Sequence, residues 1–351
     1  MNVLFFASGR NVPSTRFRIE PLANEWRKAG HLCRIFYSYP EKYDYLPYLG
    51  FRPSQWLKRA IRAGQSLIAG THSWDVVYLE RELFDAPDFE WDCALARLAN
   101  LFVVDIDDAV FLRYPTKFTQ MARNVDLVIA GNSLIADHFK ELGTATTIVP
   151  TCLNLEKYTA RQSPCSGEKP TVGWIGVTGN LPYLEIAAKG LEQAAAVIPF
   201  KLRLITGTPL ELPKFSNPNI EVEHIPWNPE TDLQELRQCD IGIMPLSDDP
   251  WSRHKCGLKL LQYMAMGIPA IASPVGVNCQ IIQHRHNGWL AETTRDWTES
   301  LLEGFTNRSL WEKISQSGRR TVEEGFDITT HAQRLANQLS EKIKLKQALK
   351  Q

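Results

Sequence analysis

The sequence predicts an α/β protein built from two doubly wound domains, each with a parallel sheet enclosed by helices. Short continuous apolar runs, typical of parallel strands buried on both faces, alternate with helical segments along the chain. The alternation stops at 161–170, a polar stretch rich in Pro, Ser and Gly, and then restarts, which indicates a linker between two domains. A length of 351 residues also suits two domains.

The first domain is predicted over 1–160. It begins with a continuous apolar run at 3–7, as expected for a buried strand, and a helix at 18–29 ends at Gly30. Another helix is expected at 134–142. Further strands are expected at 32–37, 76–79, 101–105, 127–130 and 147–149.

The second domain is predicted over 161–326, and a strongly helical tail follows at 327–351. The repeated order of strand and helix is what a second doubly wound sheet requires. Its strands are expected at 172–175, 202–205, 220–224, 241–244 and 270–272. Its helices are expected at 183–197, 230–238 and 257–266.

Composition narrows the class of protein. Lys and Arg total 39, as do Asp and Glu, and this balance argues against bulk nucleic-acid binding. Seven cysteines with no C-x-x-C pair fit the reduced thiols of a cytoplasmic protein and neither a disulfide framework nor a zinc site. No run of about 18 apolar residues is present, and the first residues lack the basic region of a signal peptide, so no membrane span is expected.

Two common nucleotide-binding motifs are missing from the sequence. No G-x-G-x-x-G follows the first strand, which argues against an enzyme with a nicotinamide cofactor. No G-x-x-x-x-G-K-[ST] is present either, which argues against a P-loop kinase or NTPase. We therefore expect no bound cofactor.

The most informative stretch is 254–278, with the sequence HKCGLKLLQYMAMGIPAIASPVGVN. Gly257 opens a helix and Gly267 closes it, and the residues between are apolar nearly all round, as in a buried helix. Only Lys259 and Gln262 interrupt that apolar surface. Both need a partner, because an unpaired buried polar group costs ~1–3 kcal/mol.

The start of this helix has the features of a phosphate site. Free backbone amides at 257–259, the positive end of the helix dipole and the side chains of Lys255 and Lys259 all favour a negative charge. The loop 274–278 follows a short buried strand, and open α/β sheets bind ligands at the carboxyl ends of their strands. The alternative is that Lys259 and Gln262 only snorkel or bond to neighbouring loops.

The same stretch resembles the nucleotide-sugar motif of GT-B glycosyltransferases of the group 1 (family 4) kind. The family pattern is Glu, seven residues, Glu, then Ala-Met-Ala-x-Gly-x-Pro-Val-(Val/Ile)-Ala-(Ser/Thr), and 263–273 follows its second part closely. His254 stands in place of the first glutamate, which in the family contacts the donor sugar. Gln262 stands in place of the second, which contacts the ribose. Both replacements still form hydrogen bonds with hydroxyl groups.

The resemblance implies two Rossmann-like domains facing a cleft, with the last helix packed back on the first domain. It also implies metal-independent sugar transfer from a nucleotide diphosphate-sugar, with retention. The second domain would bind the donor, and His254 is a catalytic candidate. The donor-binding candidates are Gly176, Val177, Thr178, Asp249, Arg253, Lys255, Gly257, Leu258, Lys259, Gln262, Gly276, Val277 and Asn278. For Asp249 the alternative is a solvated turn.

Three carboxylates, Asp105, Asp107 and Asp108, follow a buried strand of the first domain. Paired carboxylates hold a metal or act as a base. Because GT-B enzymes generally need no metal, we interpret Asp107 or Asp108 as a base or an acceptor-binding group and expect no metal site. The alternative is a helix N-cap with acidic residues in the first turn.

Three arginines, Arg16, Arg18 and Arg81, are candidates for binding an anionic acceptor or the donor diphosphate. The first two follow the loop after the first strand, and Arg81 follows the third strand. The alternative for the first two is that Ser14 or Thr15 caps a helix whose arginines are solvated.

The segment 37–64 has an unusual composition, with no acidic residue after Asp44. It holds Tyr37, Tyr39, Tyr43, Tyr45, Tyr48, Phe51 and Trp56, together with Arg52, Lys58, Arg59 and Arg62. Aromatic residues beside cations suit a peripheral contact with the inner face of a membrane or a lipid-linked acceptor. The alternative is an aromatic cluster packed under a long loop.

The sequence therefore predicts a glycosyltransferase that moves a sugar from a nucleotide diphosphate-sugar to an acceptor. The expected acceptor is a glycan or lipid-linked glycan of cell-surface polysaccharide synthesis. Two alternatives stay open. One is a catalytically lapsed GT-B protein that binds a nucleotide sugar or a partner, motivated by the loss of both glutamates. The other is a nucleotide-sugar epimerase of the same architecture.

Overall fold

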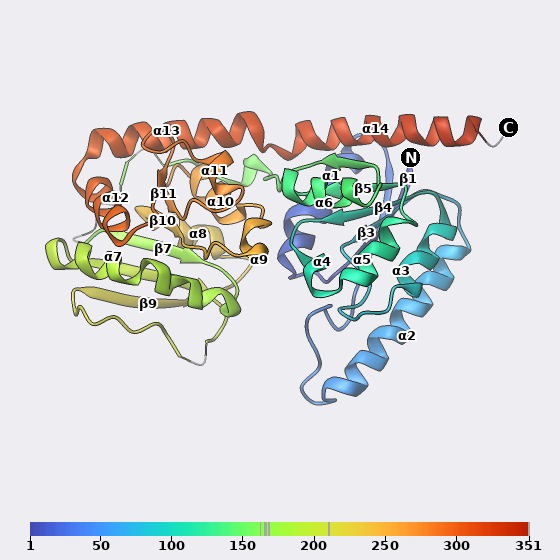
Figure 1. Cartoon of the computed structure of the whole chain (residues 1–351), viewed down its shortest axis with the longest axis horizontal. Helices are drawn as coiled ribbons and strands as arrows, with labels where there is room; N and C mark the ends of the chain where they lie inside the picture. Colours follow the sequence, from blue (N-terminus) through green and yellow to red (C-terminus); the bar gives the residue numbers. More distant parts are fainter. Residues whose placement is uncertain (162, 165–166, 168, 210, 350–351) are drawn as a thin grey trace. The chain divides into compact units, whose positions relative to one another are not determined.

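The computed structural model describes residues 1–161, 163–164, 167, 169–209 and 211–349 (Figure 1). They form two compact units, each built on a six-stranded parallel sheet. Unit 1 comprises Met1–Leu153, His254–Cys256 and Ile328–Gln351, and unit 2 comprises Asn154–Arg253 and Gly257–Asp327. The two doubly wound α/β domains predicted from the sequence are confirmed.

The sheet of unit 1 has the strand order β2-β1-β3-β4-β5-β6. Its strands are β1 (Asn2–Ala7), β2 (Leu32–Tyr37), β3 (Trp74–Glu80), β4 (Ala99–Ile106), β5 (Leu127–Ala130) and β6 (Thr146–Ile148). The chain passes from β1 to β2 and then returns to β3 on the other side of β1. The direction of winding therefore reverses between β1 and β3, and open α/β sheets bind ligands at the carboxyl ends of strands beside such a switch point.

The C-terminal helix belongs to the same unit as the first strand. Trp26 packs against Phe5 and Tyr78, and its indole nitrogen donates a hydrogen bond of 2.8 Å to the carbonyl oxygen of Ala332. The helices of unit 1 are η1 (Thr15–Ile19), α1 (Glu20–Lys28), α2 (Phe51–Gly70), α3 (Glu90–Ala94), η2 (Leu95–Leu98), α4 (Val110–Arg113), α5 (Pro115–Ala122), α6 (Ser133–Glu141) and α14 (Ile328–Ala348). Figure 1 shows α14 running beside α1.

The sheet of unit 2 has the strand order β12-β11-β10-β7-β8-β9, so its switch point lies between β7 and β10. Its strands are β7 (Thr171–Ile175), β8 (Phe200–Thr206), β9 (Ile220–Pro226), β10 (Ile241–Met244), β11 (Ala270–Ala272) and β12 (Trp289–Leu290). Its helices are η3 (Leu155–Lys157), η4 (Thr178–Tyr183), α7 (Leu184–Val197), α8 (Asp232–Leu236), α9 (Pro250–Arg253), α10 (Leu258–Ala265), α11 (Asn278–Ile281), α12 (Thr294–Thr306) and α13 (Arg308–Gly325).

The division of the chain differs from the sequence prediction in two places. Unit 1 ends at Leu153 instead of residue 160. Arg161 already belongs to unit 2, where its amide donates to the carbonyl oxygen of Met266 at 2.8 Å. His254–Cys256, expected in the second domain, groups with unit 1. Residues 162, 165–166 and 168 of the expected linker, and 350–351 of the expected tail, lie outside the described residues.

One expectation for the segment 37–64 was a long loop, but much of this segment belongs to helix α2. The sequence conceals it because the buried side chains at its centre are polar: Ser54, Lys58 and Arg62 are at most 1% exposed. Its aromatic neighbours lie outside, with Tyr48 77% and Trp56 78% exposed, so the alternative of a buried aromatic cluster is wrong. Over the residues that the structure describes, no helix is long and apolar enough to cross a bilayer.

Close packing between strand and helix predicts opposite effects for two glycine-to-alanine changes. A Cβ on Gly242 of β10 would lie 2.3 Å from the ring of Tyr263, whereas one on Gly64 of α2 would meet nothing within 4 Å. Gly242→Ala should lower the calorimetric melting temperature, because overpacking costs ~1–3 kcal/mol. Gly64→Ala should raise it, since alanine stabilises a helix interior by roughly 0.5–1 kcal/mol over glycine. A harmless Gly242→Ala would contradict the packing.

Candidate functional site

Three predicted donor loops of unit 2 follow neighbouring strands of one sheet. The loop 176–178 follows β7, the loop 245–249 follows β10, and the loop 273–277 follows β11. Strand β10 pairs in parallel with both β7 and β11. Because parallel strands present their carboxyl ends at the same edge, the three loops meet beside the switch point of this sheet.

Lys259 lies across the end of β7. Its Cε would stand only 3.0 Å from a Cβ placed on Gly176, and its Nζ lies 5.6 Å from the ring centroid of Trp174. Trp174 is buried and its face attracts the ammonium group through a cation–π interaction. The predicted residues Gly176 and Lys259 are thus brought together, and a Cβ at 176 would crowd both the ring of Trp174, at 2.9 Å, and the lysine side chain.

No side chain caps the start of α10, because its N-cap residue is Gly257. Gly257 adopts φ +68°, and a Cβ there would also meet Ile281 at 2.6 Å and Val277 at 3.2 Å. The helix start therefore packs against the segment that follows β11. The backbone amides of Leu258 and Lys259, together with the helix dipole, polarise this end positively.

Two buried amide side chains lie near these loops. Gln262, on α10, is 3% exposed. Asn278 is 1% exposed; its Nδ2 donates to the carbonyl oxygen of Ser273 at 3.0 Å, while its Oδ1 has no partner in the described part of the chain. Leaving such a group unpaired costs ~1–3 kcal/mol, which a ligand with hydroxyl or N–H groups would offset.

Asp249 and Arg253 have local partners. Asp249 caps α9, because its carboxylate accepts hydrogen bonds from the amide of Ser252 at 2.9 Å and from the hydroxyl of Ser247. Burial opposes ionisation, but these hydrogen bonds outweigh it and lower the pKa of Asp249. Arg253 forms an exposed ion pair with Asp248 at 2.5 Å.

The remaining donor candidates lie on the loops themselves. A Cβ on Gly276 would stand 2.2 Å from the carbonyl oxygen of Arg253, and its φ is +55°, so this position requires glycine. Val177 is 53% exposed, and the hydroxyl oxygen of Thr178 lies 3.5 Å from that of Thr206. These contacts join the ends of β7 and β8 and fix the start of η4.

In unit 1, the candidate arginines pair with the candidate carboxylates. Arg81 Nε lies 2.5 Å from Asp107 Oδ1, and its guanidinium reaches Asp108 at 3.8 Å. Arg18 Nε lies 2.6 Å from Asp105 Oδ1, with both side chains buried. Asp107 and Asp108 do not cap α4, whose N-cap residue is Ala109, so the N-cap alternative is wrong.

Electrostatics favour the charged forms of Asp107 and Arg18, whereas burial raises the pKa of Asp105. Burial opposes the charge on Asp107, but attraction to Arg81 outweighs it and lowers the pKa of this carboxyl group. Burial also disfavours charge on Arg18, yet attraction to Asp105 outweighs it and raises the pKa of the guanidinium. Arg81 itself adopts φ +59°, a conformation rare for residues other than glycine, so its backbone is strained to meet its partners.

The second alternative, a helix capped by Ser14 or Thr15 with solvated arginines, holds only in part. Ser14 is the N-cap residue of η1, but its side chain does not cap the helix: the hydroxyls of Ser14 and Thr15 both donate to the carboxylate of Glu80, at 2.5 Å for Thr15. Arg18 is buried, and the guanidinium of Arg16 lies 5.3 Å from the ring centroid of Phe17. Glu80, at the end of β3 beside the switch point, was missed because its partners lie 65 or more positions away.

The segment His254–Cys256 packs beside Asp107 in unit 1. Asn132 Nδ2 donates to the carbonyl oxygen of His254 at 2.8 Å, and Cys256 Sγ donates to that of Asp107 at 3.2 Å. The ring of His254 meets Phe111 edge-on at 5.2 Å. Lys255, between them, is half-buried. The segment that carries His254 and Lys255 thus lies beside Asp107. The contacts that hold it there come from Asn132 and Cys256, which no local pattern in the sequence indicates.

Neither unit displays a metal-ligand cluster. Within the part of the chain that the structure describes, no group of three or more His, Cys, Asp or Glu side chains is arranged to hold a metal ion.

Comparison with known families identifies the second unit. Residues 170–307 match the family "Glycosyl transferases group 1", and this stretch contains the loops after β7 and β11 and the whole of α10. This part of the chain is therefore similar to group 1 glycosyltransferases. No curated protein gave a significant sequence match to the chain.

Solved structures share the fold of this chain along nearly its whole length. Sucrose-phosphate synthase from Thermosynechococcus elongatus has a TM-score of 0.75 and 13% identity, covering 98% of this chain and 100% of that chain. HepE from Anabaena in complex with UDP-glucose has a TM-score of 0.71 and 14% identity, covering 97% and 100%. The catalytic domain of starch synthase IV from Arabidopsis thaliana, bound to ADP and acarbose, has 0.69 and 11%, covering 98% and 99%. These likenesses show the GT-B fold.

The Arg81–Asp107 pair predicts a pH-dependent contribution to stability. A carboxyl group with a lowered folded-state pKa stabilises the fold above its unfolded pKa, about 3.9, and this contribution is lost as pH falls through the folded pKa. Asp107→Asn should cost ~1.5–3 kcal/mol at pH 7, and this difference from wild type should shrink below pH ~4 in urea denaturation. Asp137→Asn, at an exposed ion pair, is the control and should change stability by less than ~1 kcal/mol. A difference that stays constant down to pH ~3 would contradict the assignment.

Proposed function

We propose that the protein transfers a glycosyl group from a nucleoside diphosphate sugar to an acceptor, and that unit 2 binds the donor. The observation that carries this proposal is the position of Lys259 across the glycine end of β7, at the start of α10. An ammonium group, backbone amides and a helix dipole at one place suit a diphosphate.

Each donor group has a proposed partner in unit 2. The diphosphate contacts Lys259 and the amide of Leu258, while the loops after β7 and β11 approach it with little side-chain bulk. The ribose hydroxyls bond to Gln262, a buried polar residue one turn into α10. Asn278 Oδ1 accepts a further hydrogen bond from the donor.

The proposed reaction breaks the bond between the anomeric carbon and the diphosphate oxygen and forms a bond from that carbon to an acceptor oxygen. The acceptor hydroxyl loses its proton, and the leaving diphosphate gains negative charge that Lys259 and the helix amides stabilise. Because these cationic groups are supplied by the chain, we propose that transfer needs no metal ion. We propose retention of configuration, on the resemblance to the family alone.

We propose that unit 1 binds the acceptor at the carboxyl ends of β3 and β4. Asp107 is ionised, so it can accept a hydrogen bond or a proton from an acceptor hydroxyl, and Asp108 beside it is half-buried. Arg16 is half-buried and suits an anionic group, whereas Arg18 is occupied by Asp105. The proposed acceptor is a glycan or lipid-linked glycan of cell-surface polysaccharide synthesis.

Diphosphate binding tests the donor site. Lys259→Ala should weaken the binding of UDP or ADP, measured by calorimetry in EDTA, by roughly ten- to a hundredfold, since a charged hydrogen bond contributes ~1.5–3 kcal/mol. Lys189→Ala, an exposed lysine of α7, is the matched control and should bind as wild type does. Equal affinities for the two variants would remove Lys259 from the site, and binding that requires Mg²⁺ would contradict the metal-free proposal.

The two positions that replace the family glutamates predict different kinetic effects. Gln262→Ala should weaken both nucleoside diphosphate and nucleotide sugar by about tenfold, because a lost hydrogen bond to a ligand costs ~1–1.5 kcal/mol. His254→Ala should leave diphosphate affinity unchanged and lower turnover of the sugar donor. A parallel loss of diphosphate affinity in both variants would contradict the separate roles.

A second candidate function is favoured by one observation: both acidic positions of the family motif are replaced, by His254 and Gln262. In that case the protein binds a nucleotide sugar without transferring it. Wild type would then show neither transfer nor donor hydrolysis with any nucleotide sugar, whereas the double variant His254→Glu, Gln262→Glu would gain turnover. Turnover by wild type excludes this function.

A further inference from the structure

Helix α2 buries polar side chains and exposes apolar ones, the opposite of an ordinary amphipathic surface helix. On its inner side Ser54, Lys58 and Arg62, spaced four residues apart, are buried. On its outer side Trp56 is 78% and Leu67 75% exposed. An ordinary surface helix packs its apolar stripe on the core and turns its polar residues to water. The outer face of α2 is therefore suited to a less polar environment than water.

The polar inner residues attach α2 firmly to unit 1. Arg62 donates to the carbonyl oxygens of Ala7 at 2.6 Å and Phe36 at 3.1 Å, at the ends of β1 and β2. Lys58 Nζ donates to the carbonyl oxygens of Lys42 at 2.8 Å and Asp44 at 3.1 Å. These bonds hold the helix and the preceding loop in place, so the exposed apolar side chains cannot turn inward.

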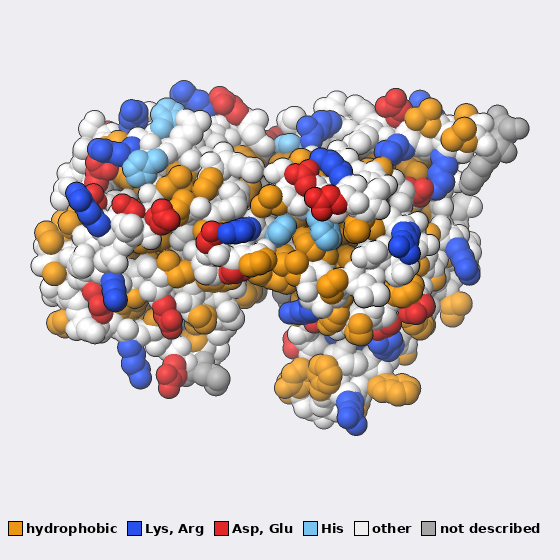
Figure 2. Space-filling model, viewed as in Figure 1, with side chains coloured by type: hydrophobic (Ala, Val, Ile, Leu, Met, Phe, Trp, Pro, Cys, Tyr) orange, Lys and Arg blue, Asp and Glu red, His pale blue; other side chains and the backbone are white. Residues whose placement is uncertain are grey.

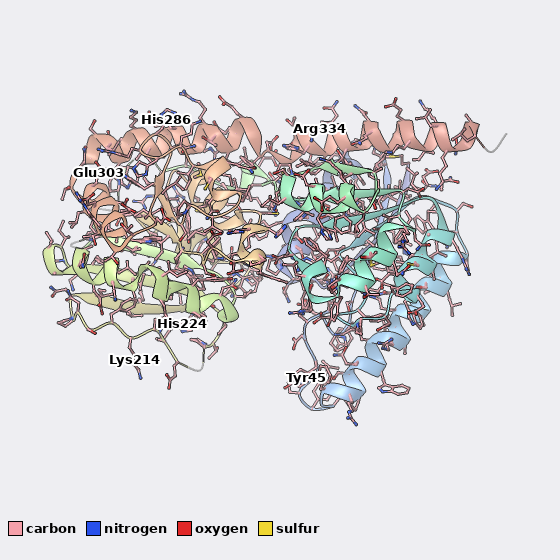
Figure 3. The ribbon with its side chains drawn as sticks, viewed as in Figure 1. Tyr45, Lys214, His224, His286, Glu303 and Arg334 are labelled. Atoms are coloured by element: carbon pink, nitrogen blue, oxygen red, sulfur yellow. The ribbon has the colours of Figure 1, made fainter. Side chains whose placement is uncertain are left out.

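The loop before α2 adds aromatic side chains at the same end. Tyr45 is 45%, Tyr48 77% and Phe51 63% exposed, and with Trp56 they form a group that we call the aromatic tip. Figure 1 shows this loop and the first turns of α2 projecting from the sheet of unit 1, and Figure 3 places Tyr45 there. Figure 2 shows hydrophobic side chains gathered at this end around a cation.

All charged residues of α2 are positive. Its 20 residues include Arg52, Lys58, Arg59 and Arg62 and no acidic residue. Lys58 and Arg62 are buried, and Arg59 forms an ion pair with Asp88 at 3.2 Å, so the outward charge comes from Arg52, which is exposed beside the aromatic tip. This end of unit 1 therefore offers positive charge next to aromatic rings.

We propose that the aromatic tip and the outer face of α2 dock on a lipid bilayer surface that carries anionic headgroups. Tyrosine and tryptophan combine an apolar ring with a polar group, which suits the boundary between headgroups and acyl chains. Arg52 attracts anionic headgroups. A projecting tip enters a deformable bilayer easily, whereas a second copy of the chain would need a matching hollow. The contact is peripheral and does not depend on the proposed transfer reaction.

Vesicle flotation with the full-length protein tests this proposal. Wild type should float with vesicles containing roughly a third phosphatidylglycerol and float less with phosphatidylcholine alone. The variant Tyr45→Ser, Tyr48→Ser, Trp56→Ser should reduce the bound fraction at least about tenfold. The control variant Ile186→Ser, Val197→Ser, Leu345→Ser removes three other exposed apolar side chains and should float as wild type does.

Two further measurements test the role of charge and exclude self-association. Arg52→Glu should reduce binding to the anionic vesicles and leave binding to phosphatidylcholine unchanged. Each of three results would overturn the proposal: wild type floats with neither vesicle; the tip variant floats as wild type does; or light scattering shows a wild-type dimer that the tip variant converts to a monomer while lipid has no effect. All variants should keep the wild-type melting temperature, because the replaced side chains are exposed.

Discussion

The close approach of Lys259 to Gly176 is the constraint on which the proposed donor site depends. The lysine side chain crosses the end of β7 over Trp174, and a Cβ at position 176 would crowd both side chains. Gly257 and Gly276 are confined as well, since a Cβ at the first would strike Ile281 of α11 and one at the second would strike the carbonyl oxygen of Arg253. Glycine thus occupies the three positions, 176, 257 and 276, where the backbone would approach the proposed diphosphate.

In unit 1, ion pairs and hydrogen bonds hold the side chains at the carboxyl ends of the strands in place. The ends of β3 and β4 carry Glu80, Asp105 and Asp107, and each is held by hydroxyl or guanidinium groups from another part of the chain. Buried ion pairs of this kind contribute little net stability, yet losing one partner is destabilising because it leaves an uncompensated charge. Their effect is to fix carboxylates in one orientation, which the proposed acceptor site would use.

The elements that depend on a local sequence pattern were predicted correctly. The elements and contacts that depend on residues far away in the sequence were not. Strands β1, β10 and β11 were found because continuous apolar runs mark buried parallel strands. The place of Lys259 in the first turn of a helix was predicted because Gly257 marks the helix start, and its role toward a ligand stays a prediction. Helix α2 was missed because its buried side chains are polar. Asn132 and Cys256 were missed because their contacts, with His254 and Asp107, span more than a hundred residues.

A crystal structure of the protein with a bound nucleoside diphosphate tests the central claim most directly. The account predicts density for the two phosphates within hydrogen-bonding distance of Lys259 Nζ and the amides that begin α10, with the ribose hydroxyls bonded to Gln262. No metal ion should bridge the phosphates when the crystals are grown in EDTA. A diphosphate bound to the arginines of unit 1, or bound in unit 2 without contact to Lys259, would contradict it.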